Sequence, residues 1–262
     1  MLKIENFEVM GWEHAIRGMR NPMNSWEKSD SGYCVQDLSR DCNNCVHKHT
    51  NYPTCRCGGF DIGPNDYALM KKLRNAGTDH RKFMRMITVY LDITAPLYWW
   101  KEFDTYKVGT VVNSCSTMHK IHEKEFTLKD FSHEHLIGSP IPNFNKPVHV
   151  TEKVEDGINK CYSFGLDTTP SCFIEWIIGV LNAYRELYLK TKDKNYWWQM
   201  IQLLPSSYNQ KRTVMLNYEV LANMYKSRKE HKLDEWREFC KWIEALPYSE
   251  LITGEKDESE NI

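Results

Sequence analysis

The pattern of hydrophobic and polar positions predicts a chain that mixes strands with helices. Apolar and polar side chains alternate over residues 2–10, with one irregularity, and again over 87–93, which predicts two β-strands. A short apolar run at 212–216 suits a third strand or the entry to a helix. Apolar residues recur at helical spacing in seven other segments: the ten residues after Gly11, 64–76, a short turn around Phe83, 170–187, 195–204, 217–228 and 232–243.

Polar residues and prolines at the expected positions set the boundaries of these helices. Asn217 lies where a helix N-cap is needed, because its side-chain oxygen can accept a hydrogen bond from a free N–H group of the first turn. Thr168 or Thr169 caps the long helix, with Pro170 near its first position. Gly77 provides a C-terminal stop for the helix that begins at Pro64.

Two helices carry informative apolar faces. The helix after Lys232 places Trp236, Phe239, Cys240 and Ile243 on one side, which predicts a buried face. The helix from Phe173 to Leu187 has a wider apolar face, which indicates burial between other elements or at a subunit interface.

The composition describes a globular chain with balanced charge. With 262 residues the chain can form one sizeable core or two small ones. The 34 basic and 35 acidic residues give a net charge of −1, which argues against general coating of nucleic acid. The N-terminal segment lacks the pattern of a secretory signal, and no uncharged apolar run approaches the roughly 18 residues of a membrane span. We therefore expect a cytoplasmic protein whose nine cysteines are thiols or metal ligands rather than disulfides.

A cysteine-rich segment offers a candidate zinc site. Two close thiol pairs about ten residues apart can fold back so that four sulfur atoms meet around Zn²⁺. The four expected ligands are Cys42, Cys45, Cys55 and Cys57, and Cys34, His47 or His49 could substitute for one of them. Reduced buried thiols and a redox switch are the alternatives.

The C-terminal part of the chain carries a specific spacing of three residues. Asn217 follows Pro205 by twelve residues, and Arg228 follows Asn217 by eleven. This segment resembles the C-terminal signature of the flavin-dependent thymidylate synthases. In that family the Asn lies at the flavin and the Arg holds the phosphate of the nucleotide.

The resemblance continues in the first half of the chain, with changes. Met10-Gly11 followed by a helix ending at Arg20 is similar to the family's opening, and Phe83 and Ala95-Pro96 agree with its next motif. Arg85 stands where the family has a flavin-contacting His. The resemblance therefore implies a retained fold with altered flavin contacts.

The family's diagnostic motif is largely replaced. Counted from Pro96, Glu102 falls at the Gln that reads the pyrimidine, and Thr105-Tyr106-Lys107 falls at Arg-His-Arg. Thr110 falls at the first Ser, and Asn113 and Ser116 match the Asn and the second Ser. Ile201 stands where the family has a phosphate-gripping Arg. Since Lys cannot reproduce the bidentate fork of Arg, these losses weaken a phosphate site.

By this resemblance we expect an α+β fold with an antiparallel sheet packed with helices, assembled as a homotetramer with ligand sites shared between subunits. A single domain would cover residues 1–254, with a Cys-rich insertion at about 31–63 and a loop-rich insertion at about 121–167. The acidic tail 255–262 is expected to be disordered.

Two functions are compatible with these residues. The first is a protein that binds or sequesters a nucleotide-like ligand without the family's chemistry. The second is an active flavin-dependent enzyme that moves a one-carbon unit onto a pyrimidine nucleotide, with FAD as cofactor. The candidate ligand residues are Arg20, Arg85, Glu102, Tyr106, Lys107, Thr110, Asn113, Ser116, Asn217, Asn223 and Arg228.

Arg228 is the central residue of this prediction. We expect it to face Arg20, Tyr106, Lys107 and Ser116, contributed by a neighbouring subunit. The alternative is that Arg228 only pairs with a helix carboxylate such as Glu230 or Glu235, which would be worth about 0–1 kcal/mol if the pair is exposed.

Overall fold

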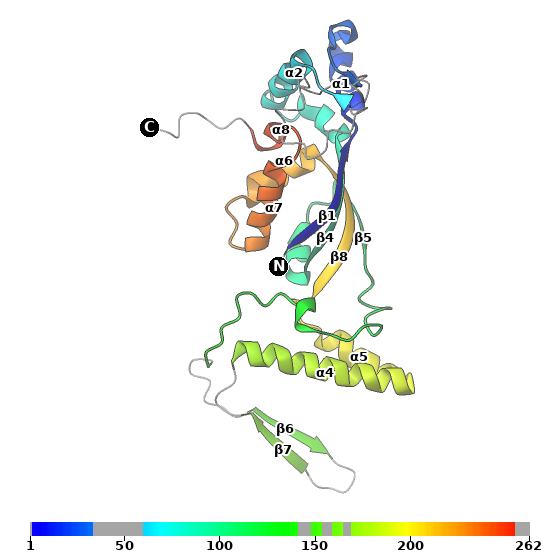
Figure 1. Cartoon of the computed structure of the whole chain (residues 1–262), viewed down its shortest axis with the longest axis vertical. Helices are drawn as coiled ribbons and strands as arrows, with labels where there is room; N and C mark the ends of the chain where they lie inside the picture. The colour runs from blue at the N-terminus through cyan, green and yellow to red at the C-terminus, as the bar shows by residue number, and fades with distance from the viewer. Residues whose placement is uncertain (1, 34–59, 141–147, 154–158, 165–168, 255–262) are drawn as a thin grey trace, which may run out of the picture. The chain divides into compact units, whose positions relative to one another are not determined.

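The computed structural model describes residues 2–33, 60–140, 148–153, 159–164 and 169–254 (Figure 1). These residues divide into two compact units. The larger unit comprises the described parts of 2–95, 99–114 and 211–262, and the smaller one comprises those of 96–98 and 115–210. Whether residues 1–254 form a single domain, as the sequence predicts, stays a prediction.

A four-stranded sheet with the order β1-β4-β8-β5 forms the centre of the larger unit. Its strands are β1 (Lys3–Met10), β4 (Thr88–Pro96), β8 (Asn209–Asn217) and β5 (Val111–Ser114). β1 pairs antiparallel with β4, and β5 pairs antiparallel with β8. The pairing of β1 shifts between Glu5 and Glu8, which confirms the predicted irregularity. The apolar run at 212–216 is part of a strand.

The alternating side chains of β4 explain the two faces of this sheet. Val89, Leu91 and Ile93 are buried on one face. On the other face, the Asp92 carboxylate accepts hydrogen bonds from Thr213 Oγ1 at 2.7 Å and Asn6 Nδ2 at 3.0 Å. Thr213 and Asn6, together with Lys211, lower the pKa of Asp92 to about 2.

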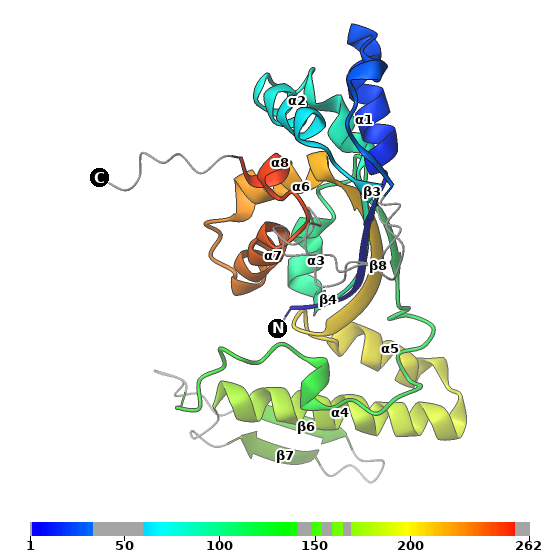
Figure 2. The ribbon, with the colours of Figure 1, turned by 45° about the horizontal axis from the view of Figure 1, so that its top comes forward.

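Helices of the larger unit pack against this sheet, and Figure 2 shows α3, α6 and α7 on the same side of it. The helices of the larger unit are α1 (Trp12–Arg20), α2 (Pro64–Asn75), α3 (Leu97–Phe103), α6 (Tyr218–Arg228), α7 (Asp234–Glu244) and α8 (Glu250–Thr253). Three 3₁₀-helices, η1 (Asn21–Met23), η2 (Trp26–Lys28) and η5 (Arg81–Met86), and the short strands β2 (Gly32–Tyr33) and β3 (Phe60–Asp61) complete its described elements.

Aromatic side chains fill the space between the sheet and these helices. Trp99, Phe103, Trp236 and Phe239 are at most 1% exposed, and the rings of Trp99 and Trp236 lie 4.8 Å apart. The predicted buried face of α7 is confirmed, because Cys240 and Ile243 are buried with Trp236 and Phe239. Large-to-alanine changes in such a cluster cost about 3–5 kcal/mol each, so it is a rigid support.

The smaller unit contains the helices α4 (Pro170–Thr191) and α5 (Lys194–Leu203), and the 3₁₀-helix η6 (Leu128–Asp130). Thr169 caps α4 by accepting a hydrogen bond from the amide of Cys172 at 3.1 Å. Lys192, with φ of 59°, forms the turn into α5. Seven buried residues from α4, from α5 and from the segment 121–131 form the core of this unit: Ile121, Phe126, Phe131, Ile174, Ile178, Leu181 and Met200. Phe173 and Trp176 on α4 stay about half exposed.

A β-hairpin lies within the segment 121–167, which was predicted to be a loop-rich insertion. Its strands β6 (Val148–Lys153) and β7 (Asn159–Phe164) pair antiparallel. Within the described ranges, no helix has both the length and the apolar character that a bilayer crossing requires.

Candidate functional site

Helix α6 begins directly where strand β8 ends, and Asn217 joins the two. The Asn217 side-chain oxygen accepts a hydrogen bond from the Val220 amide at 3.0 Å, which confirms the predicted N-cap. Gly109, with φ of 79°, packs against this cap, since an added Cβ would lie 2.8 Å from Asn217 Nδ2. The segment that carries Tyr106 is thereby held against the first turn of α6.

The last turn of α6 places Arg228 in a defined cluster. Arg228 donates from Nη1 to Glu102 Oε2 at 2.7 Å and from Nε to the Tyr106 hydroxyl at 3.0 Å. Its guanidinium carbon lies 4.8 Å from the centre of the Trp236 ring. The Arg228 side chain is 19% exposed, so it is largely fixed but still reaches solvent. We call Glu102, Tyr106, Arg228, His231 and Trp236 the Arg228 cluster.

Glu102 receives all its contacts in this cluster on one oxygen atom. Oε2 accepts from Arg228 and from Trp236 Nε1 at 2.9 Å, and it lies 3.4 Å from His231 Nε2. The Leu233 amide donates to His231 Nδ1 at 3.2 Å, which leaves Nε2 as the protonated nitrogen that faces Glu102. Within the described residues Oε1 has no hydrogen-bond partner, and the Glu102 side chain is 35% exposed.

Trp236 forms the rigid floor of the cluster. Its side chain is fully buried, and Phe103 stacks on it at 6.4 Å while Phe239 meets it edge-on at 5.9 Å. A cation over an indole face is attracted by the ring quadrupole. The floor therefore orients the Arg228 guanidinium, and the ring itself is not accessible to a ligand.

Several lysines lie in the two segments that carry Glu102 and Arg228. Of the acidic residues in segments 101–107 and 226–232, Glu102 pairs with Arg228, Asp104 pairs with Arg212, and Glu230 is exposed. Within the part of the chain that the structure describes, five lysines of these segments form no ion pair: Lys101, Lys107, Lys226, Lys229 and Lys232.

The first turns of α6 carry a second charged group, centred on Glu219. This buried carboxylate accepts from Arg85 Nε, and it also accepts from Arg85 Nη2 at 3.3 Å. Arg81 Nε lies 3.6 Å from Glu219, and Arg81 donates to the side-chain oxygen of Asn223 at 3.2 Å. The hydrogen bond with Glu219 raises the pKa of Arg85. Two of the predicted residues, Arg85 and Asn223, thus bind other side chains of the same chain.

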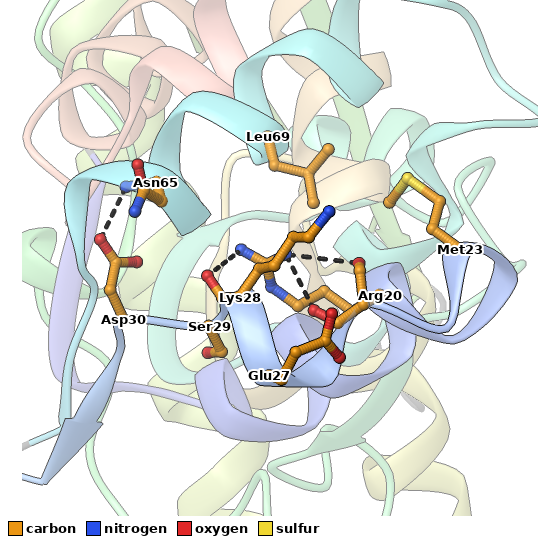
Figure 3. Close-up of a pocket in the computed structure, with 9 residues that line it drawn as sticks. Arg20, Met23, Glu27, Lys28, Ser29, Asp30, Asn65 and Leu69 are labelled. Carbon is orange, nitrogen blue, oxygen red and sulfur yellow. Dashed lines mark hydrogen bonds between the residues drawn. The ribbon is translucent and has the colours of Figure 1, made fainter.

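Arg20 belongs to a closed network at the end of α1. It donates from Nε to Asp66 Oδ1 at 2.6 Å, and from its terminal nitrogens to the backbone oxygens of Ser25 at 3.2 Å and Lys28 at 3.1 Å. Both Arg20 and Asp66 are buried. Arg20 lines an open cleft of about 740 Å³ together with Ser25 and Lys28, and Figure 3 shows its hydrogen bonds to these residues as dashed lines.

Asp66 is the acceptor centre of that network. Its Oδ2 accepts from the hydroxyls of Ser29 at 2.7 Å and Ser31 at 2.6 Å, and from the amides of Asp30 and Ser31 at 3.2 Å each. Burial raises the pKa of Asp66, but the hydrogen bonds from Ser29, Ser31 and Arg20 outweigh it and hold that pKa below its ordinary value. Arg20 therefore has a structural partner in Asp66, and its role in ligand binding stays a prediction.

The other predicted residues form no common group of side chains in the described part of the chain. Lys107 and Asn113 are exposed, and the buried hydroxyl oxygen of Thr110 has no hydrogen-bond partner in the described chain. Ser116, whose hydroxyl accepts from the His119 amide at 2.9 Å, belongs to the smaller unit. The structure thus brings together Glu102, Tyr106 and Arg228, and it does so within a single chain.

The predicted zinc ligands Cys42, Cys45, Cys55 and Cys57 lie outside the described residues, so this site stays a prediction. In the described ranges, no group of three or more His, Cys, Asp or Glu side chains is arranged to hold a metal ion.

Sequence reasoning missed three functional-site neighbours: Arg81, Glu219 and His231. Glu219 and Asn223 are four residues apart and therefore share a helix face. A helical projection of the sequence would have placed Glu219 beside the predicted residue Asn223. His231 lies beyond the end of α6, where no periodic pattern points to it. The partner of Arg228 is neither Glu230 nor Glu235 but Glu102, more than a hundred residues earlier.

Comparison of the fold with solved structures gives long but distant matches. A crystal structure of thymidylate synthase X from Helicobacter pylori, solved with FAD and dUMP, matches with a TM-score of 0.57 and 14% identity over 97% of this chain and 98% of that chain. A second structure, of the flavin-dependent thymidylate synthase from Helicobacter pylori complexed with FAD and dUMP, matches with a TM-score of 0.55 and 14% identity, over 96% and 97% of the two chains. No family model and no curated protein matches the sequence.

The chain therefore has the fold of the flavin-dependent thymidylate synthases, as the sequence resemblance predicts. The expected combination of helices with an antiparallel sheet is confirmed. At 14% identity the likeness concerns the fold, and the chemistry of the site has to be argued from this chain's own residues.

Proposed function

We propose that this protein binds a nucleotide-like small molecule at the Arg228 cluster and does not carry out the thymidylate synthase reaction. The observation that carries the proposal is the partly exposed Arg228 guanidinium, held between Trp236, Tyr106 and Glu102 amid unpaired lysines. Arg presents planar donor pairs that match phosphate oxygens, and the nearby lysines add attraction for an anion.

The Tyr106 ring suits the base of such a ligand. Tyr106 is half-buried, and its hydroxyl accepts from Arg228, which fixes the ring beside the guanidinium. Trp236 is fully buried beneath Arg228, so Tyr106 is the aromatic residue of the cluster that a base can reach. The Helicobacter pylori structures with this fold contain dUMP, which supports a nucleotide as the ligand class.

One of the two expected flavin positions does not fit a flavin well. Arg85, which stands where the family has a flavin-contacting His, donates from Nε and Nη2 to the Glu219 carboxylate, so a flavin contact through these nitrogens would have to replace charge-assisted hydrogen bonds. Asn217 uses its side-chain oxygen in the helix cap and keeps its side-chain amide nitrogen as a donor. This internal pairing supports binding rather than catalysis.

The alternative is an active flavin-dependent transferase, and the FAD in the neighbouring structures favours it. An assembly of four copies belongs to either function and follows from the sequence resemblance and from the half-exposed Phe173 and Trp176 on α4. A monomer mass in light scattering at micromolar concentration would rule out this assembly.

Purified protein distinguishes the two functions. The proposal expects no flavin absorbance between 350 and 500 nm, roughly the range of the oxidised isoalloxazine, and heat release on titration with nucleoside monophosphates. Turnover of dUMP in the presence of FAD, a reductant and a folate one-carbon donor would establish the alternative. If no nucleotide binds with or without FAD, both functions fail.

A further inference from the structure

We propose that Glu102 is a specificity-determining residue of the Arg228 cluster: its carboxylate occupies the guanidinium and reduces the contribution that a ligand's phosphate makes to binding. This inference rests on the proposed nucleotide-binding function and goes beyond it, because it concerns which part of the ligand the site selects.

Two of the three guanidinium nitrogens of Arg228 already donate to side chains of the cluster. A phosphate bound by an arginine fork takes two N–H groups on one edge of the guanidinium. The edge formed by Nη1 and Nη2 has Nη1 on Glu102, and the edge formed by Nε and Nη2 has Nε on Tyr106. Since Nη1 carries two N–H groups, a bidentate phosphate must either share Nη1 with the Glu102 carboxylate or displace the Tyr106 hydroxyl from Nε.

The negative charge of Glu102 opposes the binding of a phosphate at Arg228. If the phosphate displaces Tyr106 instead, Glu102 still lies 2.7 Å from Nη1 and places a negative charge a few ångströms from the incoming anion. At that distance one unit charge near a protein surface changes an anion's affinity on the order of tenfold. Both routes reduce the contribution of a phosphate, whereas an uncharged nucleoside meets no such penalty.

Glu102 is fixed in this position. Trp236 Nε1 and His231 Nε2 both approach the same oxygen that Arg228 holds, so the carboxylate cannot swing away without losing these contacts. A competing carboxylate on a freely rotating side chain would have little effect. This one is anchored by a buried indole.

Glu102→Gln tests the proposal, because it removes the charge and keeps an oxygen that can accept from Arg228 and Trp236. Calorimetric titrations would compare adenosine with AMP and uridine with UMP on each protein. We expect the affinity ratio of monophosphate to nucleoside to rise about tenfold in Glu102→Gln, with the nucleoside affinity nearly unchanged.

Glu230→Gln is the matched control. It makes the same change of charge two residues from Arg228, on an exposed side chain for which the described chain shows no hydrogen bond or ion pair. We expect it to leave the ratio within about twofold of the wild-type value, as water and salt screen an exposed charge that is not held against the guanidinium. Thermal unfolding of both variants confirms that the fold is kept.

The possible outcomes separate the role of Glu102 from the proposed nucleotide-binding function. If nucleotides bind but Glu102→Gln leaves the ratio unchanged or lowers it, the role of Glu102 is wrong and the proposed function stands. An equal rise in both variants would also overturn the inference, because net charge would then explain it. If neither wild type nor Glu102→Gln binds any nucleotide or nucleoside, the proposed function and this inference fail together.

Discussion

Two arginines that the family resemblance marks in the same way lie in very different surroundings. Arg20 is buried and bonded to Asp66 and two backbone oxygens, while Arg228 is 19% exposed and shares its donors with Glu102 and Tyr106. A ligand could bind the Arg20 guanidinium only by replacing one of these buried acceptors, which would be unfavourable in free energy. The second network keeps a charged group partly at the surface, which is why the proposed binding site is placed at Arg228.

The number and burial of an arginine's partners therefore separate a structural arginine from a candidate ligand-binding arginine better than its position in a motif does. Removing one partner of a buried ion pair leaves an uncompensated charge inside the protein, whereas removing a partly exposed one lets water take its place. The two regions should therefore respond differently to the same substitution.

Arg20→Ala should have the largest effect on stability. It leaves the buried Asp66 carboxylate without its ion-pair partner, which is expected to lower the free energy of unfolding by about 3–5 kcal/mol. Urea unfolding measures this, with Arg17→Ala, an exposed position on the same helix, as the control near zero. A loss below about 1 kcal/mol for Arg20→Ala would remove the distinction between the two regions.

Gly109→Ala tests whether the support of the Arg228 cluster is equally rigid. Alanine at φ of 79° is strained, and its Cβ would approach Asn217 Nδ2 to 2.8 Å. We expect a loss of about 1–3 kcal/mol in the free energy of unfolding. Gly138→Ala, where nothing lies within 4 Å of an added Cβ, provides the comparison and should change stability by less than about 1 kcal/mol.

Arg228→Ala should cost less stability than either change. The pair with Glu102 is partly solvated and the contact with Trp236 adds a cation–aromatic term, so about 1 kcal/mol is expected. The same urea titration measures it. A loss as large as that of Arg20→Ala would mean that Arg228, too, is mainly a structural residue.

Acid should weaken the closed network through Asp66. Its folded-state pKa lies below the ordinary value, so it stabilises the protein at neutral pH, and this contribution is lost as the pH falls through the folded pKa. The stability gap between wild type and Asp66→Asn should thus narrow below about pH 4, by at most about 1.4 kcal/mol per pH unit for one proton. Unfolding at pH 7 and at pH 3 tests this, and a gap that widens in acid would contradict it.

Local patterns of the sequence predicted the elements that depend on local chemistry. The irregular first strand, the cap at Asn217, the cap at Thr169 and the buried face of α7 are all present. Each of these follows from side-chain periodicity or from a hydrogen bond within one turn, which the sequence displays directly.

Long-range pairings could not be predicted in the same way. The spacing of Asn217 and Arg228 pointed to α6, but that Arg228 would pair with Glu102 depends on how α3 and α7 pack on the sheet. The partner of Arg20 likewise lies 46 residues away, at Asp66. The hairpin of β6 and β7 was not expected in a segment with many turn signals.

The measurement that tests the central claim most directly is calorimetric titration of nucleoside monophosphates into wild type, Arg228→Ala and Arg17→Ala. If the Arg228 cluster is the binding site, Arg228→Ala weakens binding about thirtyfold, or by about 2 kcal/mol, and Arg17→Ala leaves it unchanged. Equal affinities for wild type and Arg228→Ala would contradict the assignment of the site to this cluster.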